Sequence, residues 1–272
     1  MGLEITLLGT GIPYPNPDRA GPSYLVRAGE TKVMVECGSG AVRRLVEAGH
    51  SPGDIHHLFL SHLHSDHFID LGHFIVSRWI MGDDRPLHLY GSEGLQRMVD
   101  LLIEFLEPDL RMRMKIRRVH RDMPDITIHH LFEGEAFEEN GFTVTAFDVE
   151  HFPLDQPFGY RFNIKDRGIV FSGDTRPCEN LIKHAQRVDV LVHECTEART
   201  WAKERQSSQI DTSHIQHSHT QPEQLGLVAR DAEAKILVAT HMSPKSVPDE
   251  LKSTIARDFA GPITIGEDLM TI

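Results

Sequence analysis

The sequence predicts an α/β fold in which helices cover a β-sheet. Apolar runs of strand length alternate along the chain with segments whose apolar residues recur at helical spacing. The 272 residues have a hydrophobic content of 40%, which is sufficient for a substantial core, and no break in composition divides them. We therefore expect a single domain over residues 1–272.

In the first half of the chain, strands precede the first helices. We expect a strand over Leu3–Leu8 and then a hairpin of two strands, Ser23–Ala28 and Thr31–Glu36. The proline-rich loop Ile12–Pro22 is either a wall beside a pocket, with Tyr14 exposed, or a plain surface loop. The following elements alternate between helix and strand: Ala41–Ala48, Ile55–Leu60, Phe68–Ile80, Leu87–Tyr90 and Gly94–Leu106.

Strands predominate in the second half, where two helices are also expected. Thr220 to Glu223 is typical of a capping box and predicts that a helix begins there. The expected strands are Phe142–Phe147, Phe158–Ile164, Gly168–Phe171, Val188–Val192 and Lys235–Ala239, and the expected helices are Gln221–Arg230 and Pro248–Phe259.

One segment, Arg111–Arg121, concentrates basic residues in the sequence RMRMKIRRVHR. Apolar and cationic residues alternate from Arg111 to Ile116, a period of two that predicts a strand with its cations on the exposed face. Two interpretations follow, a patch that faces phosphate groups or a solvated strand edge that discourages aggregation.

The densest group of metal-ligand residues is SHLHSDH, which directly follows an apolar strand. If the chain stays extended, His62, His64 and Asp66 share one face, and His67 joins them only if the backbone turns. Three imidazoles and a carboxylate within six residues form the ligand set that zinc favours. A polar loop with chance histidines is a poor explanation of this density.

Four side chains from one loop cannot complete two metal sites, so further ligands are expected from other strand ends. His151, Asp174 and His241 each follow an apolar strand, where side chains from several strands converge. With SHLHSDH they make five histidines and two aspartates, enough for two four-coordinate sites that share one carboxylate.

These motifs resemble the metallo-β-lactamase superfamily of hydrolases, and most closely its ribonuclease Z branch. Their order along the chain is that of the family, and they span nearly all of it. They are SHLHSDH, His151 with FGYR at Phe158–Arg161, FSGDTRP at Phe171–Pro177, LVHEC at Leu191–Cys195, the pair His219-Thr220, and THMSP at Thr240–Pro244.

The resemblance implies an αββα sandwich of two mixed sheets flanked by helices, with two metal ions in a cleft at its edge. It assigns seven ligands: His62, His64 and His151 to one ion, Asp66, His67 and His241 to the other, and Asp174 as the bridge. It also implies that Glu194 orients His219. We expect two zinc ions, or manganese or iron, to share a hydroxide that attacks the substrate.

Two catalytic roles accompany that ligand set. Asp66 is placed to accept a hydrogen bond from the attacking water, and His219 is expected to protonate the leaving oxygen. A helix-start histidine in a histidine-rich loop is the alternative for His219, but LVHEC supplies the carboxylate that its catalytic role requires.

The sequence departs from tRNA-processing relatives in one respect. These enzymes carry a glycine- and proline-rich basic arm after the GYR strand, whereas here Lys165–Gly168 leads directly to the next strand. The net charge of −12 does not replace that arm for binding a polyanion. The long segment Glu197–Gln216 is interpreted as a lid. These features favour a small ester, most of all a phosphodiester, over a folded RNA.

Alternative functions remain a tRNA 3′-processing endonuclease, a lactonase and, least favoured, a sensor or structural subunit without activity. Three isolated cysteines favour a reducing cytoplasm. No apolar run approaches the roughly 18 residues of a membrane span, and no signal peptide is expected. Relatives of this branch are commonly homodimers, which we expect here too.

Overall fold

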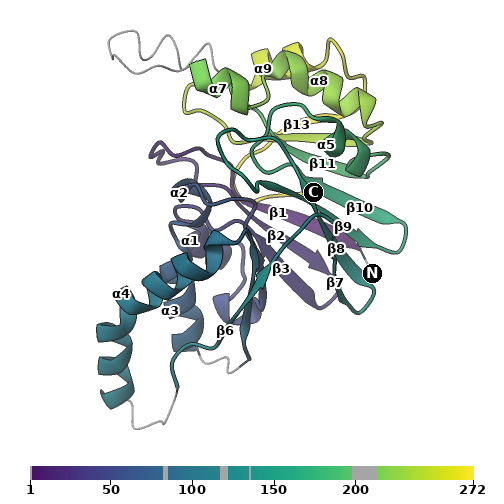
Figure 1. The fold of residues 1–272 in the computed structure, drawn as a ribbon. Coiled ribbons are helices and arrows are strands. Elements are labelled where there is room, and N and C mark those ends of the chain that lie inside the picture. The colour runs from purple at the N-terminus through teal and green to yellow at the C-terminus, as the bar shows by residue number, and fades with distance from the viewer. Residues whose placement is uncertain (1, 82–84, 117–121, 135, 198–212) are drawn as a thin grey trace, which may run out of the picture.

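The computed structural model describes residues 2–81, 85–116, 122–134, 136–197 and 213–272 (Figure 1). Two mixed β-sheets of seven strands each pack face to face, and helices cover their outer surfaces. The predicted αββα sandwich is confirmed.

The first sheet is built almost entirely from the first half of the chain. Its order is β14-β1-β2-β3-β4-β5-β6. The pairs β14–β1, β1–β2 and β2–β3 are antiparallel, whereas β3 to β6 run parallel. The strands are β1 (Leu3–Gly9), β2 (Ser23–Ala28), β3 (Thr31–Val35), β4 (His57–Phe59), β5 (Leu87–Gly91), β6 (Ile126–His130) and β14 (Met270–Thr271). The helical elements of this half are α1 (Ala41–Glu47), η1 (Pro52–Asp54), α2 (Ser65–Phe68), α3 (Leu71–Met81) and α4 (Gly94–Ile116).

The second sheet comes from the second half and has the order β13-β12-β11-β10-β9-β8-β7. β10 to β13 run parallel, and β8 points the same way as β10 because β9 is antiparallel to both. The strands are β7 (Ala136–Glu139), β8 (Phe142–Asp148), β9 (Phe158–Ile164), β10 (Arg167–Phe171), β11 (Val190–Glu194), β12 (Ile236–Thr240) and β13 (Ile263–Ile265). The described helices are α5 (Glu179–His184), α7 (Ser213–Ser218), α8 (Pro222–Asp231) and α9 (Pro248–Ile255).

Aromatic side chains fill the space between the two sheets. Alternate residues of β9 point inward, so that Phe158, Tyr160 and Phe162 are fully buried. The Phe59 ring of the first sheet meets the Tyr160 ring edge to face, with centroids 5.3 Å apart. This core fixes the two sheets relative to each other and therefore fixes the loops at their common edge.

The strand predicted for Arg111 to Ile116 is wrong, because these residues form the last turns of α4. Arg111 pairs with Glu107 and Arg113 with Asp109, four residues earlier in each case, and such pairs stabilise a helix but not a strand. Residues 117–121 of the same basic segment lie outside the described residues.

Several other boundaries differ from the prediction. The Phe68–Ile80 helix is two helices, α2 and α3. The predicted capping box is shifted by one residue, since the backbone N–H of Gln221 donates to Oε1 of Gln224. The Thr220 hydroxyl instead donates to the backbone carbonyl of Thr175. The proposed lid falls mostly on residues 198–212, outside the described residues. None of the helices in the described ranges is long and apolar enough to cross a membrane.

Candidate metal centre and active site

Three histidine nitrogens converge at the edge of the sandwich. His62 and His64 lie in the loop between β4 and α2, and His151 follows β8. The Nδ1 atom of His64 lies 3.1 Å from Nε2 of His62 and 3.2 Å from Nε2 of His151. The first predicted ligand triad is therefore assembled.

A second group lies beside the first. Asp66 and His67 sit on α2, and His241 follows β12. Oδ2 of Asp66 is 3.3 Å from Nε2 of His241 and 3.6 Å from Nε2 of His67. The short helix α2 is the turn that brings His67 to the site, whereas the expected extended face does not exist, because β4 ends at Phe59.

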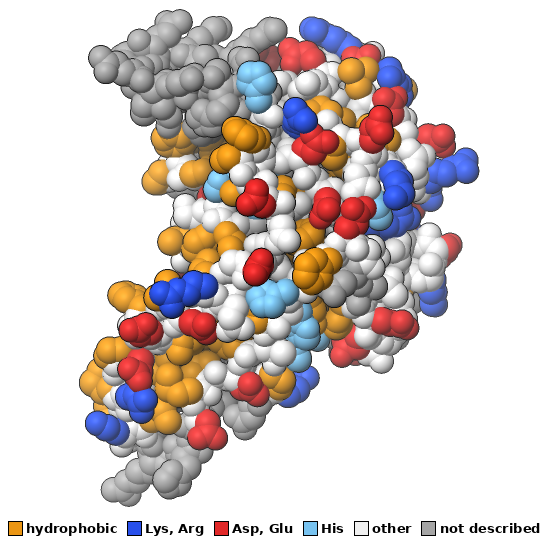
Figure 2. Space-filling model, viewed as in Figure 1, with side chains coloured by type: hydrophobic (Ala, Val, Ile, Leu, Met, Phe, Trp, Pro, Cys, Tyr) orange, Lys and Arg blue, Asp and Glu red, His pale blue; other side chains and the backbone are white. Residues whose placement is uncertain are grey.

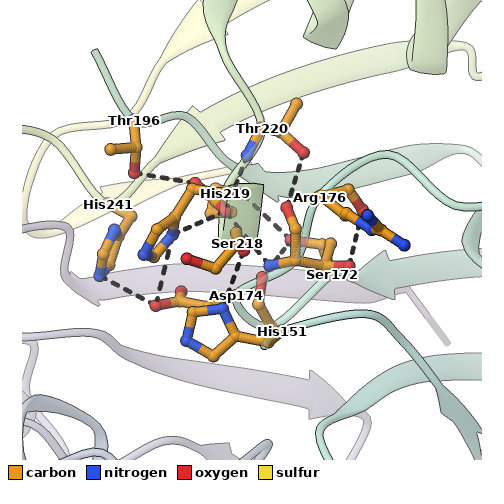
Figure 3. Close-up of polar contacts among 12 residues, drawn as sticks. His151, Ser172, Asp174, Arg176, Thr196, Ser218, His219, Thr220 and His241 are labelled. Carbon is orange, nitrogen blue, oxygen red and sulfur yellow. Dashed lines mark hydrogen bonds and ion pairs between the residues drawn. The ribbon is translucent and has the colours of Figure 1, made fainter. Parts of the chain in front are cut away.

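Asp174 lies between the two groups, and Figure 3 shows its side chain beside His241. Its Oδ2 atom is 3.4 Å from Nε2 of both His67 and His241, and 4.0 Å from Nε2 of His62. The preceding Gly173 has a φ of +59°, and a Cβ there would lie 2.6 Å from the carbonyl oxygen of Phe158. Only glycine allows this close turn, which directs Asp174 into the centre.

The geometry and charge of this cluster fit metal ions. Around a tetrahedral zinc ion with bonds of 2.0–2.1 Å, ligand nitrogens lie about 3.3 Å apart, close to the separations among the three histidines. Among the described residues, the ion pairs of Asp66 and Asp174 are all with histidines, so no permanent cation balances these buried carboxylates. His151 donates from Nδ1 to the Ser218 carbonyl at 2.8 Å, which leaves the Nε2 lone pair directed at the triad.

The pKa shifts agree with this charge pattern. Burial lowers the pKa of His62, His64 and His151, which keeps these imidazoles neutral and able to bind a cation. Burial would raise the pKa of Asp174, but His241 and His67 outweigh it and hold that pKa well below its usual range. Asp174 is therefore an anion in the middle of the cluster.

A separate hydrogen-bonded pair, Glu194 and His219, adjoins the centre. Glu194 ends β11 and is buried, and its Oε1 accepts a hydrogen bond of 2.9 Å from Nδ1 of His219. Oε1 also accepts from the amides of Thr175 and Thr220, and Oε2 accepts from the Thr196 hydroxyl. Burial would lower the pKa of His219, but the Glu194 carboxylate outweighs it and raises that pKa to about 9.

One buried carboxylate of this region, Glu36, was not anticipated. It follows β3 with a φ of +61°, accepts hydrogen bonds from the Ser61 amide, and lies 3.5 Å from Nδ1 of His67. It thus holds both the start of the histidine loop and one of its side chains. The signal was present, because Glu36 is an acidic residue at the end of an apolar strand, as Asp174 is.

A pocket of about 650 Å³ opens beside Asp66. The proline-rich loop forms one of its walls, which agrees with one of the two interpretations of its sequence, and contributes Tyr14, whose side chain is exposed. Arg43 of α1 and the exposed Ile69 also line it. A volume of this size is typical of a site for a small molecule.

Comparisons with known proteins agree with this arrangement. The family model described as anti-Pycsar protein Apyc1 matches residues 3–211. Ribonuclease Z of Mycobacterium bovis (strain BCG / Pasteur 1173P2) is 32% identical over 276 residues, which cover 98% of this chain and 96% of that protein.

Two solved structures share the fold. The metallo-β-lactamase fold protein YhfI from Bacillus subtilis has a TM-score of 0.77 at 20% identity, with 99% of this chain and 98% of that chain covered. A diphosphatase of the PhnP family has a TM-score of 0.72 at 16% identity, with coverages of 100% and 97%. The chain belongs to the ribonuclease Z-like branch of the metallo-β-lactamase-fold hydrolases, metal-dependent enzymes that cleave ester bonds, and its amino-terminal three quarters match the Apyc1 family.

Proposed function

We propose that this protein is a dinuclear zinc hydrolase that cleaves a small phosphodiester. The observation that carries the proposal is the convergence of five histidines and two aspartates beside a pocket of small-molecule size. A protein of the same fold is named as a diphosphatase, and this supports phosphorus as the atom that is attacked.

Seven side chains would hold the ions, in the two triads described above with Asp174 between them. Bound there, two cations would supply Lewis acidity toward a substrate oxygen and a water of near-neutral pKa. We propose zinc because neutral imidazole and carboxylate are its preferred ligands, with manganese or iron as alternatives. Asp66, beside the pocket, would orient the attacking water by accepting its hydrogen bond.

Glu194 and His219 would assist the departure of the leaving group. Because the Glu194 carboxylate accepts the Nδ1 proton, the His219 ring is fixed in orientation with its other nitrogen available for proton transfer. A proton delivered by His219 to the leaving oxygen would complete ester cleavage.

The connection between β9 and β10 favours a small substrate. Ile164 and Arg167 are paired across the hairpin, so only Lys165 and Asp166 form the turn. The resemblance to tRNA-processing enzymes would place a basic arm here, and two residues cannot form one. A substrate of this protein would therefore be held by the pocket itself.

The direct test is turnover of bis(4-nitrophenyl) phosphate by protein loaded with zinc or manganese. We expect hydrolysis by the wild type and at least a roughly 100-fold loss in Asp66→Ala, since that change removes a proposed ligand and the water-orienting group. A panel of diesters, carboxylic esters and lactones follows. Activity toward lactones alone would replace the phosphodiester with the lactone, and no activity on any member would refute the proposal.

A second candidate, tRNA 3′-end processing, is favoured by the 32% identity to a ribonuclease Z. The basic segment Arg111–Arg121 would supply its phosphate contacts, although Arg111 and Arg113 already pair with acidic residues of α4. Salt-sensitive cleavage of precursor tRNA, weakened by Arg113→Gln and Lys115→Gln, would support this candidate. Absence of tRNA binding at low salt would exclude it.

We also propose that the protein acts as a homodimer in the cytoplasm. The three cysteines are unpaired and buried, which suits a reducing compartment. Exposed apolar side chains on α4, among them Phe105 and Ile116, support the dimer.

A further inference from the structure

The proline-rich loop forms one wall of the pocket beside Asp66, and its two ends lie next to each other. The Gly11 amide donates to the Ala20 carbonyl at 2.8 Å, so the chain leaves β1 and returns to nearly the same place. Figure 2 shows hydrophobic side chains, a class that includes proline, at the edge of the molecule where this loop lies in Figure 1. The loop therefore projects from the body of the protein.

The backbone between these ends has no backbone partner. Among the residues that the structure describes, no backbone–backbone hydrogen bond involves residues 12–19. The proline rings stiffen the loop, but they do not attach it to its surroundings. The position of this wall thus depends on the contacts that hold the ends of the loop.

One carboxylate, that of Asp268, holds both ends. Its Oδ1 atom accepts hydrogen bonds from the backbone N–H of Thr10 at 3.0 Å and from the Thr10 hydroxyl at 2.8 Å. Its Oδ2 atom accepts from the backbone N–H of Ala20 at 2.6 Å. The residue that precedes the loop and the residue that closes it are therefore bound to the same side chain.

The same carboxylate orients Arg44 of α1, which lines the pocket together with the loop. Oδ2 of Asp268 accepts from Nε of Arg44 at 3.0 Å, and Nη2 of Arg44 donates to the carbonyl of Asp18 in the loop at 3.1 Å. The side chain of Asp268 is only 4% exposed, so water weakens this ion pair little. Asp268 thus joins two walls of the pocket.

The segment that carries Asp268 is bound to both sheets. The Leu269 amide donates to a carbonyl of β1 at 2.6 Å, and the Gly266 amide donates to a carbonyl of β12 at 2.8 Å. The Gly266 carbonyl accepts from Nη1 of Arg19 at 2.6 Å, which adds a second link to the loop. The wall is therefore attached to the sandwich by residues from the other end of the sequence.

We propose that Asp268 is a positioning residue for the substrate pocket, because its carboxylate holds the proline-rich loop against α1. The effect on catalysis rests on the proposed function, whereas the position of the loop can be tested without any reaction. Among the described residues, the hydrogen-bond partners of this carboxylate are Thr10, Ala20 and Arg44, none of which is a proposed metal ligand. Asp268 should therefore affect the binding of substrate and not the chemical step.

Asp268→Asn tests this role, because every group that contacts the carboxylate is a donor. An amide would turn an N–H group toward two of these donors, and it would lack the charge that pairs with Arg44. We expect KM for bis(4-nitrophenyl) phosphate to rise about tenfold, while kcat stays within about twofold of wild type. The zinc content should stay unchanged.

The matched control is Glu267→Gln, the same kind of change at the neighbouring residue. Glu267 is exposed, so the loss of its charge should leave KM, kcat and zinc content as in wild type. Thr10→Val is a milder variant that keeps the carboxylate and removes one donor to it. It should raise KM by a smaller factor, and it provides the kinetic test if Asp268→Asn does not fold.

Digestion with trypsin tests the position of the loop without substrate or metal. Trypsin cleaves after arginine, and the Arg19–Ala20 bond lies where Asp268 holds the chain. Cleavage requires this part of the loop to detach from the protein. We expect Asp268→Asn to release residues 1–19 at least about fivefold faster than wild type, measured by mass spectrometry, and Glu267→Gln to match wild type.

Three results would overturn the proposal. A KM for folded Asp268→Asn within twofold of wild type would mean that the loop does not position substrate, even if trypsin cleaves it faster. A lower kcat accompanied by loss of zinc would place the effect at the metal centre. Equal cleavage of Asp268→Asn and wild type would mean that Asp268 does not hold the loop. If wild-type protein hydrolyses no ester, the proposed function fails, and the rate of cleavage alone decides whether Asp268 positions the wall.

Discussion

At the scale of single residues, the centre depends on buried carboxylates whose oxygens accept hydrogen bonds from several neighbours. Glu194 shows this most clearly, since its two oxygens accept from His219, Thr175, Thr220 and Thr196. An acceptor-only group is required there, because every partner is a donor. The resemblance to the family already implied Glu194 and His219 as a pair, whereas Glu36 lies in none of the motifs that carry this resemblance.

Glu194→Gln should therefore reduce kcat by about 10²- to 10⁴-fold while metal content stays unchanged. The amide would place an N–H group against one of the donors and would no longer fix the tautomer of His219. Steady-state hydrolysis and metal analysis measure the two effects. Thr196→Val is the control, since it removes one hydrogen bond from Oε2 of Glu194 and should reduce kcat much less. A kcat for Glu194→Gln within twofold of wild type would contradict the pair.

Gly173→Ala should destabilise the protein by more than the about 1–2 kcal/mol expected for a left-handed alanine. The added Cβ would lie 2.6 Å from a backbone oxygen of Phe158, and the shift that relieves the contact would displace Asp174. Urea unfolding and metal affinity should both decline. Gly141→Ala is the matched control, because Gly141 also has a positive φ, of +77°, but no atom lies within 4 Å of its Cβ position. Equal losses in the two variants would mean that the contact has no effect.

At the scale of elements, periodicity located the strands that form the interior, since β8 to β12 were expected within about two residues of their observed limits. It failed for α4, where Arg111 to Ile116 satisfies a period of two although the residues are helical. Ion pairs four residues apart and the burial of Leu110 decide the conformation there, and neither is visible in a two-residue alternation. The edge strands β6, β7, β13 and β14 were missed because they are short and only partly apolar.

Strands β4 to β6 carry a row of rings that predicts a pH effect. Burial, together with the neighbouring His88 and His56, lowers the pKa of His57 to about 4. An unfolded histidine titrates near pH 6.5, so between pH 6.5 and 4 the unfolded chain binds a proton that the folded chain does not. The free energy of unfolding should therefore fall as the pH falls through this window.

Replacing His57 by phenylalanine removes that proton and should make the stability less dependent on pH between 6.5 and 4.5. Urea unfolding at several pH values measures the slope. His130→Phe changes an exposed histidine of β6 and should leave the slope as in wild type. If His57→Phe and wild type lose stability in parallel, His57 is not the group responsible.

At the scale of the whole molecule, the cluster joins the two sheets. Four of its side chains come from the loop and helix after β4, and three follow strands of the second sheet. The sequence predicted this convergence because ligands were expected at the carboxyl ends of apolar strands. It did not provide the pocket beside Asp66, which requires loops from distant parts of the chain to meet.

Removal of metal by a chelator should lower the Tm, and zinc should restore it. Ligand binding to the folded state at 100 times Kd contributes about 2.7 kcal/mol. Thermal unfolding followed by circular dichroism, with and without added zinc, measures the shift. Asp174→Asn should show a much smaller zinc-dependent shift than wild type. A Tm that zinc leaves unchanged in wild type would argue against a site shared by both sheets.

The aromatic layer between the sheets has a further consequence. The seven proposed ligands are divided between two sheets, which rings such as Phe59 and Tyr160 hold at a fixed distance. A smaller side chain in this layer should therefore alter the distances between the ligand atoms at the edge of the sandwich. A conservative change there, far from any of the proposed ligand atoms, should lower the affinity for metal ions. The zinc affinity measured by titration would thus report on the packing between the two sheets.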